Sequence, residues 1–302
     1  MTAGIAMAAT TQPSLFVPQV VLAADGTPAA RAAANIASAL AARWHVRPHV
    51  VTVLPPPPVP AEPMITAAAW QPYLADELRT EVDHQLAACS SDASNWAREV
   101  GVGTPATEIV RIAESRSADL IILGLRSHAL LDRVFRDETA LSVMRHATAP
   151  VLAVTPLMTQ LPRRIAVAID FSRASITAAR AALRLLDDGG SLLLVYVEPP
   201  IEPFAEMAEG YGVIYAQGVA AAFARLRSEL AANANVDIET VVLHGNVAPE
   251  LLSFSARADV DVLAVGSQRH SIAHRAFVGS VTSALARAGS RSLLVVPPGR
   301  RA

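Results

Sequence analysis

The stretch RIAVAIDFS, residues 164–172, decides the fold: a short apolar run ends in an acid, and a small hydroxyl residue follows two positions later. QVVLAADGT, residues 19–27, carries the same pattern 145 residues earlier. Two further pairs of segments match in the same order, and they are SADLIILGLRS (117–127) with DVDVLAVGSQR (259–269), and APVLAVTP (149–156) with RSLLVVPP (291–298). A nearly constant separation over three landmarks indicates that the chain contains one domain twice.

Each half alternates short apolar runs, such as IAVAI and LLVV, with Ala-rich helical segments. Continuous apolar runs are typical of parallel strands that helices cover on both faces. Thr27 and Ser172 are placed to cap the helix after the first strand of each half. Successive βα units predict an α/β protein of two tandem doubly wound domains, each with about five strands and four helices. The Pro-containing segment 155–164 separates them, which gives domains 1–158 and 159–302.

Composition excludes several classes of function. The chain has 302 residues and a net charge of −2, so it lacks the basic excess of a nucleic-acid partner. No apolar run reaches the roughly 18 residues that a spanning helix needs, and the N-terminus lacks the basic start of a secretory signal. We therefore expect a cytoplasmic protein with no membrane partner. There is no lysine, which excludes a P-loop and Schiff-base chemistry.

The second half carries the stronger candidate site. Ligands of an open α/β sheet bind at the carboxyl ends of strands, where the strand order reverses. Asp170 ends the first strand of this half, and GSQRHSIAHRAFVGSVT, residues 266–282, follows the fourth. Gly279 and Ser280 open the next helix, where small residues leave backbone N–H groups available to an anion.

These residues resemble the universal stress protein family, which binds ATP through G-x2-G-x9-G-[ST] after the fourth strand, with an Asp ending the first. Gly266, Gly279 and Ser280 match in position and spacing, whereas Arg269 replaces the second glycine. The resemblance covers nearly the whole chain, twice. It implies a Rossmann-like fold, of the adenine nucleotide alpha hydrolase type, with five parallel strands in the order 3-2-1-4-5 in each half.

The resemblance also implies how the second half would hold ATP, with Mg²⁺ bound alongside. Asp170 and the backbone at Val197 would hold the adenosine end. Gly266 and the turn formed by Gly279, Ser280 and Val281 would cradle the ribose and phosphates.

Arg269 leaves two alternatives open. Its side chain blocks a close approach of backbone to phosphate, or its guanidinium replaces that approach with charge. His270, His274 and Arg275 add donors in the same loop. No third zinc ligand accompanies the two histidines, so we expect no metal site.

The first half departs further from the family pattern. Gly124 matches the first glycine, but Ser127 replaces the second, and Asp137 and Glu138 replace the final Gly-Ser. Carboxylates at a helix N-terminus act as caps and would repel a triphosphate. We expect a degenerate nucleotide site here, with Asp25 only hydrogen-bonding its own turn.

The leading functional hypothesis is a stress-response or signalling module that binds an adenine nucleotide in its second half. No residue is marked as a base for efficient ATP cleavage, so slow hydrolysis is the most we expect of it as an enzyme. The alternative is a partner-binding scaffold in which both sites have decayed. Because family members usually dimerise through their last strand, the resemblance implies that VLAVTP and LLVVPP pair internally. A homodimer of the whole chain stays open.

Overall fold

A computed structural model describes residues 18–56, 65–125, 137–198, 211–231, 236–267 and 279–298. The first half consists of β1 (Val20–Ala23), α1 (Pro28–Trp44), β2 (His49–Leu54), α2 (Ile65–Cys89), the 3-10 helix η1 (Ser91–Asn95), β3 (Arg98–Val102), α3 (Pro105–Ser115), β4 (Leu120–Gly124), α4 (Asp137–His146) and β5 (Val151–Val154). The second half consists of β6 (Arg164–Ala168), α5 (Arg173–Leu185), β7 (Ser191–Glu198), α6 (Tyr211–Ala231), β8 (Asp237–His244), α7 (Val247–Arg257), β9 (Val262–Gly266), α8 (Ser280–Ala288) and β10 (Ser292–Val296).

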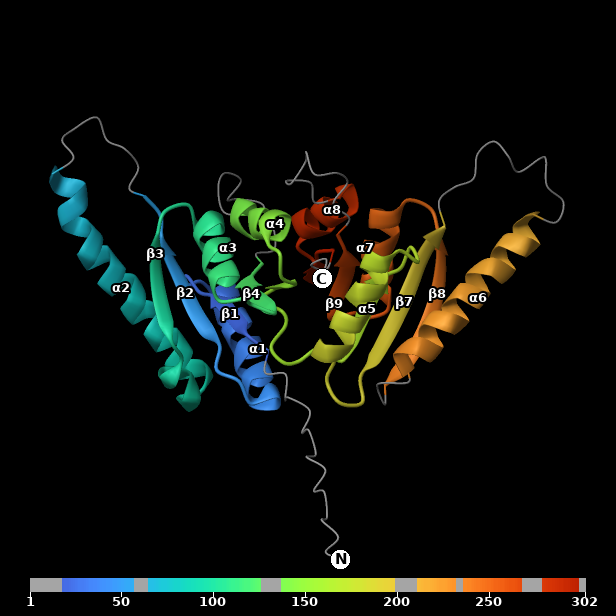
Figure 1. The fold of residues 1–302 in the computed structure, drawn as a ribbon, viewed down its shortest axis with the longest axis horizontal. Coiled ribbons are helices and arrows are strands. Elements are labelled where there is room, and N and C mark those ends of the chain that lie inside the picture. The colour runs from blue at the N-terminus through green and yellow to red at the C-terminus, as the bar shows by residue number, and fades with distance from the viewer. Residues whose placement is uncertain are drawn as a thin grey trace, which may run out of the picture.

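The strands form one ten-stranded sheet in the order β3-β2-β1-β4-β5-β10-β9-β6-β7-β8. Within each half all pairs are parallel, and β5 and β10 join the halves as an antiparallel pair. Figure 1 shows the two halves side by side, with α4 and α8 near the centre and α2 and α6 at the two ends. The predicted α/β class with two tandem units is confirmed.

The two faces of the sheet bury separate apolar layers. One layer packs beneath α1, α2, α5 and α6. The other packs beneath α3, α4, α7 and α8. Strands covered on both faces must be apolar throughout, which explains why their sequences run continuously rather than alternate.

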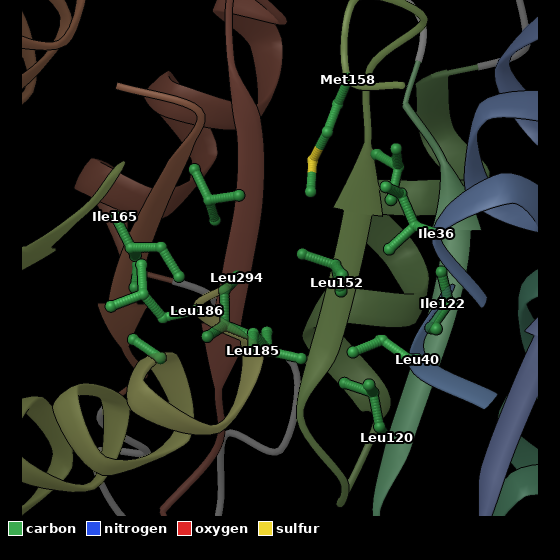
Figure 2. Close-up of a cluster of buried hydrophobic side chains, with 14 of the residues drawn as sticks. Ile36, Leu40, Leu120, Ile122, Leu152, Met158, Ile165, Leu185, Leu186 and Leu294 are labelled. Atoms are coloured by element: carbon green, nitrogen blue, oxygen red, sulfur yellow. The ribbon is translucent and has the colours of Figure 1, made fainter. Parts of the chain in front are cut away.

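The apolar layer beneath α1 and α5 is continuous across the join between the halves. Leu152 of β5 is the register partner of Leu294 of β10, and both are fully buried. Figure 2 shows them between Ile36 and Leu40 on one side and Ile165 and Leu186 on the other. The pairing also removes two open strand edges from solvent.

Hydroxyl side chains start the first helix of each half as predicted. Thr27 Oγ1 accepts a hydrogen bond from Ala30 N at 3.2 Å, with Pro28 in the first helical position. Ser172 Oγ accepts one from Ser175 N at 3.2 Å. Within the described ranges, no helix is long and apolar enough to cross a bilayer.

Candidate functional site

Each half has a cavity at the carboxyl ends of its strands. The first and fourth strands of each half are neighbours, β1 with β4 and β6 with β9, so the strand order reverses between them. The first-half cavity has a volume of about 500 Å³ and the second-half cavity about 360 Å³. Both lie where an open α/β sheet binds its ligands.

The second-half cavity brings together six of the seven residues that the sequence marked as nucleotide-binding. They are Asp170, Val197, Gly266, Gly279, Ser280 and Val281. The seventh, Arg269, lies outside the described residues, as do His270, His274 and Arg275.

Asp170 occupies the turn between β6 and α5. Its Oδ1 accepts a hydrogen bond from Ser172 N at 3.0 Å, and its own backbone N–H donates to Ser175 Oγ at 3.4 Å. Partial burial alone would raise the pKa of Asp170, but hydrogen bonds from Ser172 and Ser175 outweigh it and hold the pKa below its usual value. The carboxylate is therefore ionised at neutral pH and can accept hydrogen bonds from a ligand.

Gly266 has a packing role that the sequence did not reveal. A Cβ on this residue would lie 2.4 Å from the carbonyl carbon of Ala174, in the first turn of α5. Gly124 has the same relationship in the first half, where a Cβ would lie 2.6 Å from the carbonyl carbon of Ala29. This glycine is required by the contact of strand and helix in both halves, so its presence does not by itself indicate a ligand.

Gly279 differs from Gly266, because no contact with the part of the chain that the structure describes requires a glycine there. Among the described residues, no heavy atom lies within 4 Å of an added Cβ, and the φ of −53° is open to any residue. It precedes α8, whose N-terminus has no side-chain cap hydrogen bond. Gly279 and Ser280 line the second-half cavity, where the first N–H groups of the helix can meet an anion.

Sequence reasoning missed four of the hydroxyl-bearing residues that line the second-half cavity. They are Ser175, Tyr196, Ser267 and Thr282. The Tyr196 hydroxyl shares a hydrogen bond with that of Tyr215 on α6. Burial, followed by this bond, raises the pKa of Tyr196 to about 12, so the phenol stays protonated. Tyr196 could have been predicted to lie at the site, because it precedes Val197 at the end of the same strand.

The first-half cavity is lined by the equivalent turn residues but differs at the helix that follows β4. Asp25 Oδ1 accepts hydrogen bonds from Thr27 N at 3.1 Å and Thr27 Oγ1 at 2.6 Å, which confirms the predicted turn bond. α4 begins at Asp137 and continues with Glu138, in the place that Gly279 and Ser280 take in the second half. The predicted capping role of Asp137 and Glu138, and the role of Ser127, lie outside what the structure describes.

Comparison with known proteins gives the same family for both halves. The model of the universal stress protein family matches residues 18–155 and again residues 162–297. A universal stress protein of Methanocaldococcus jannaschii is 31% identical over 144 residues, which is 45% of this chain and 81% of that protein.

Two solved structures have the same fold along most of the chain. A universal stress protein from Archaeoglobus fulgidus DSM 4304 has a TM-score of 0.68 at 18% identity, over 94% of this chain and 100% of that one. A functionally unknown protein from Pseudomonas aeruginosa PAO1 has a TM-score of 0.57 at 14% identity, over 94% of each chain.

Proposed function

Because the chain belongs to the universal stress protein family, we propose that it binds an adenine nucleotide, ATP, in the cavity of its second half and acts as a ligand-responsive module of a stress response. The gathering of Asp170, Val197, Gly266 and the Gly279–Ser280 turn around one cavity carries the proposal. These residues come from four separate segments of the chain and meet at the reversal of strand order.

The adenosine end lies at the ends of β6 and β7. The ionised Asp170 accepts hydrogen bonds from the base or ribose. The register of β6 with β7 ends at Val195, so β7 continues past its neighbour to Val197. Its backbone there extends beyond the last paired residue of β6 and offers a ligand a hydrogen-bonding edge.

The phosphates lie at the start of α8. The first turn of this helix has no side-chain cap, and the Ser280 and Thr282 hydroxyls line the cavity beside it. Backbone N–H groups and the helix dipole both favour negative charge at this point. Bound Mg²⁺ would neutralise part of the phosphate charge. Among the described residues, no cluster of three His, Cys, Asp or Glu is arranged to hold a metal.

Gly279→Asp tests the phosphate end, because it places a carboxylate beside the proposed phosphates. We expect ATP affinity to fall by about tenfold or more in a titration of the nucleotide-stripped chain. Gly218→Asp is the matched control: Gly218 lies on α6, where an added Cβ also meets open space. Unchanged ATP affinity in Gly279→Asp would refute this placement. An unaltered chain that binds no ATP would favour the scaffold alternative.

A further inference from the structure

The first-half cavity is the larger of the two, and its walls are mostly apolar. It has a volume of about 500 Å³, within the roughly 300–1,000 Å³ of small-molecule sites. Val51, Val53, Leu78, Ile109 and Leu123 form much of its surface. Such walls suit the flat apolar faces of an aromatic ring system.

Few polar groups line this cavity, and none of its described lining residues is basic. The polar lining residues are Asp25, Thr27 and Thr139. Both hydrogen bonds that Asp25 accepts within its turn end on Oδ1, so a ligand donor would meet Oδ2. The cavity therefore offers a hydrogen-bond acceptor to a ligand and no cation in its described lining.

Formal charge distinguishes the two cavities at the end where a phosphate would lie. The second-half helix opens with Gly279 and Ser280, both neutral. The first-half helix α4 opens with Asp137 and Glu138, both acidic. Acidic residues at the start of a helix oppose the approach of a second anion there. The acidic start of α4 therefore makes this cavity unfavourable for a phosphate.

The opposite end of the cavity is alike in the two halves. Asp25 and Asp170 end equivalent strands, and Val53 and Val197 occupy equivalent positions on the next strand. We propose that the first-half cavity binds a phosphate-free ligand, an uncharged aromatic heterocycle such as a nucleoside. The choice of a nucleoside rests on the proposed function of the second half, whereas the exclusion of phosphate rests on the first-half residues alone. The chain would then have two sites of different ligand class.

The test uses the full chain with Asp170→Ala and Gly279→Asp together, which remove the proposed acceptor at the adenosine end of the second-half site and place a carboxylate at its phosphate end. This chain is titrated with adenosine, AMP and ATP. We expect adenosine to bind at one site per chain, and AMP and ATP to bind about tenfold more weakly or less. Val53→Trp and Thr139→Phe fill the cavity from a strand and from a helix, and each should abolish adenosine binding. Val102→Trp is the control, because Val102 is exposed on β3, outside the cavity.

Two results would overturn the proposal: no adenosine binding by the chain with Asp170→Ala and Gly279→Asp, or ATP binding there as tight as that of adenosine. Asp137→Gly with Glu138→Ser provides a reciprocal test, since it should raise AMP affinity in that background. ATP binding by Val53→Trp with Asp170 and Gly279 both intact reports the second-half site separately. Failure of that binding would contradict the proposed function and leave the adenosine result to stand.

Discussion

Phe171 packs edge-on against Phe223, with ring centroids 5.1 Å apart, although its own backbone has a φ of 58°. A left-handed backbone costs a non-glycine residue about 1–2 kcal/mol. Its counterpart in the first half is Gly26, with a φ of 76°. Both turns require this conformation, and in the second half the contacts of Phe171 with Phe223 and Tyr196 offset its cost.

At position 171 we therefore expect glycine to destabilise the protein less than alanine does, which is the reverse of the usual order. Both Phe171→Ala and Phe171→Gly lose the aromatic contacts and should be less stable than the unaltered chain. Phe171→Gly should be the more stable of the two by about 1 kcal/mol, because glycine adopts positive φ without strain. Urea unfolding of the two variants measures the difference, and an alanine variant at least as stable as the glycine variant would refute this account of the turn.

The glycines that end β4 and β9 should matter for stability more than Gly279 does. Gly124→Ala and Gly266→Ala each force a Cβ into the backbone of the following helix, so we expect losses of about 1–3 kcal/mol. Gly279→Ser adds a favoured cap residue in open space and should change stability by less than about 0.5 kcal/mol. Denaturation midpoints of the three variants test this, and a stable Gly266→Ala would show that the strand and helix are less tightly packed.

The shared core predicts that the two halves unfold together. All three tryptophans, Trp44, Trp70 and Trp96, belong to the first half, but the guanidinium of Arg184 in the second half lies 5.9 Å from the ring centroid of Trp44. The measurement therefore uses a Trp44→Phe background, in which Trp70 and Trp96 report the first half. Leu294→Ala removes a fully buried side chain from the second half, and we expect a loss of about 2–5 kcal/mol. The tryptophan transition should shift as far as the transition seen by circular dichroism. A fluorescence transition that stays in place would mean that the halves are thermodynamically independent.

His49 predicts a loss of stability in mild acid. Its Nε2 lies 3.1 Å from Glu99 Oε2, but burial, followed by the charge of Arg116, lowers the pKa of the imidazole. Below the unfolded pKa of about 6.5 the unfolded chain binds a proton that the native chain resists. The contribution of neutral His49 to the free energy of unfolding should therefore be fully present above the unfolded pKa. It should be lost progressively as the pH drops from the unfolded pKa to the lower native pKa.

His49→Gln should flatten this part of the stability–pH curve. His146→Gln, which removes an exposed imidazole on α4, is the control and should keep the fall. Urea midpoints between pH 5 and pH 8, a range in which histidine titrates, measure both curves. An unaltered slope in His49→Gln would assign the fall to other groups.

Much of the fold was predictable from sequence, because the features that specify it are local and repeated. The apolar runs, the helix caps at Thr27 and Ser172, and the acids at the strand ends recur at a nearly fixed separation. Because each pattern occurs twice, each copy confirms the interpretation of the other. A single α/β domain of this length would offer no such internal comparison.

The shape of each cavity could not be predicted, because it depends on side chains far apart in the sequence. Tyr196 lies on β7 and its partner Tyr215 on α6, and nothing in their spacing shows that the hydroxyls meet. The first half, predicted to be degenerate, nevertheless encloses the larger cavity. The sequence motif identifies the residues at the phosphate end of the site. It does not determine the volume of the cavity between the strands and helices.

Calorimetric titration of ATP onto the nucleotide-stripped full chain, with Asp25→Ala and Asp170→Ala as a matched pair, tests the central claim most directly. The two aspartates end equivalent strands, so the two substitutions are chemically identical and differ only in the half they affect. We predict one ATP per chain, retained in Asp25→Ala and lost in Asp170→Ala. Two ATP per chain, or loss of binding only in Asp25→Ala, would contradict a nucleotide site in the second half.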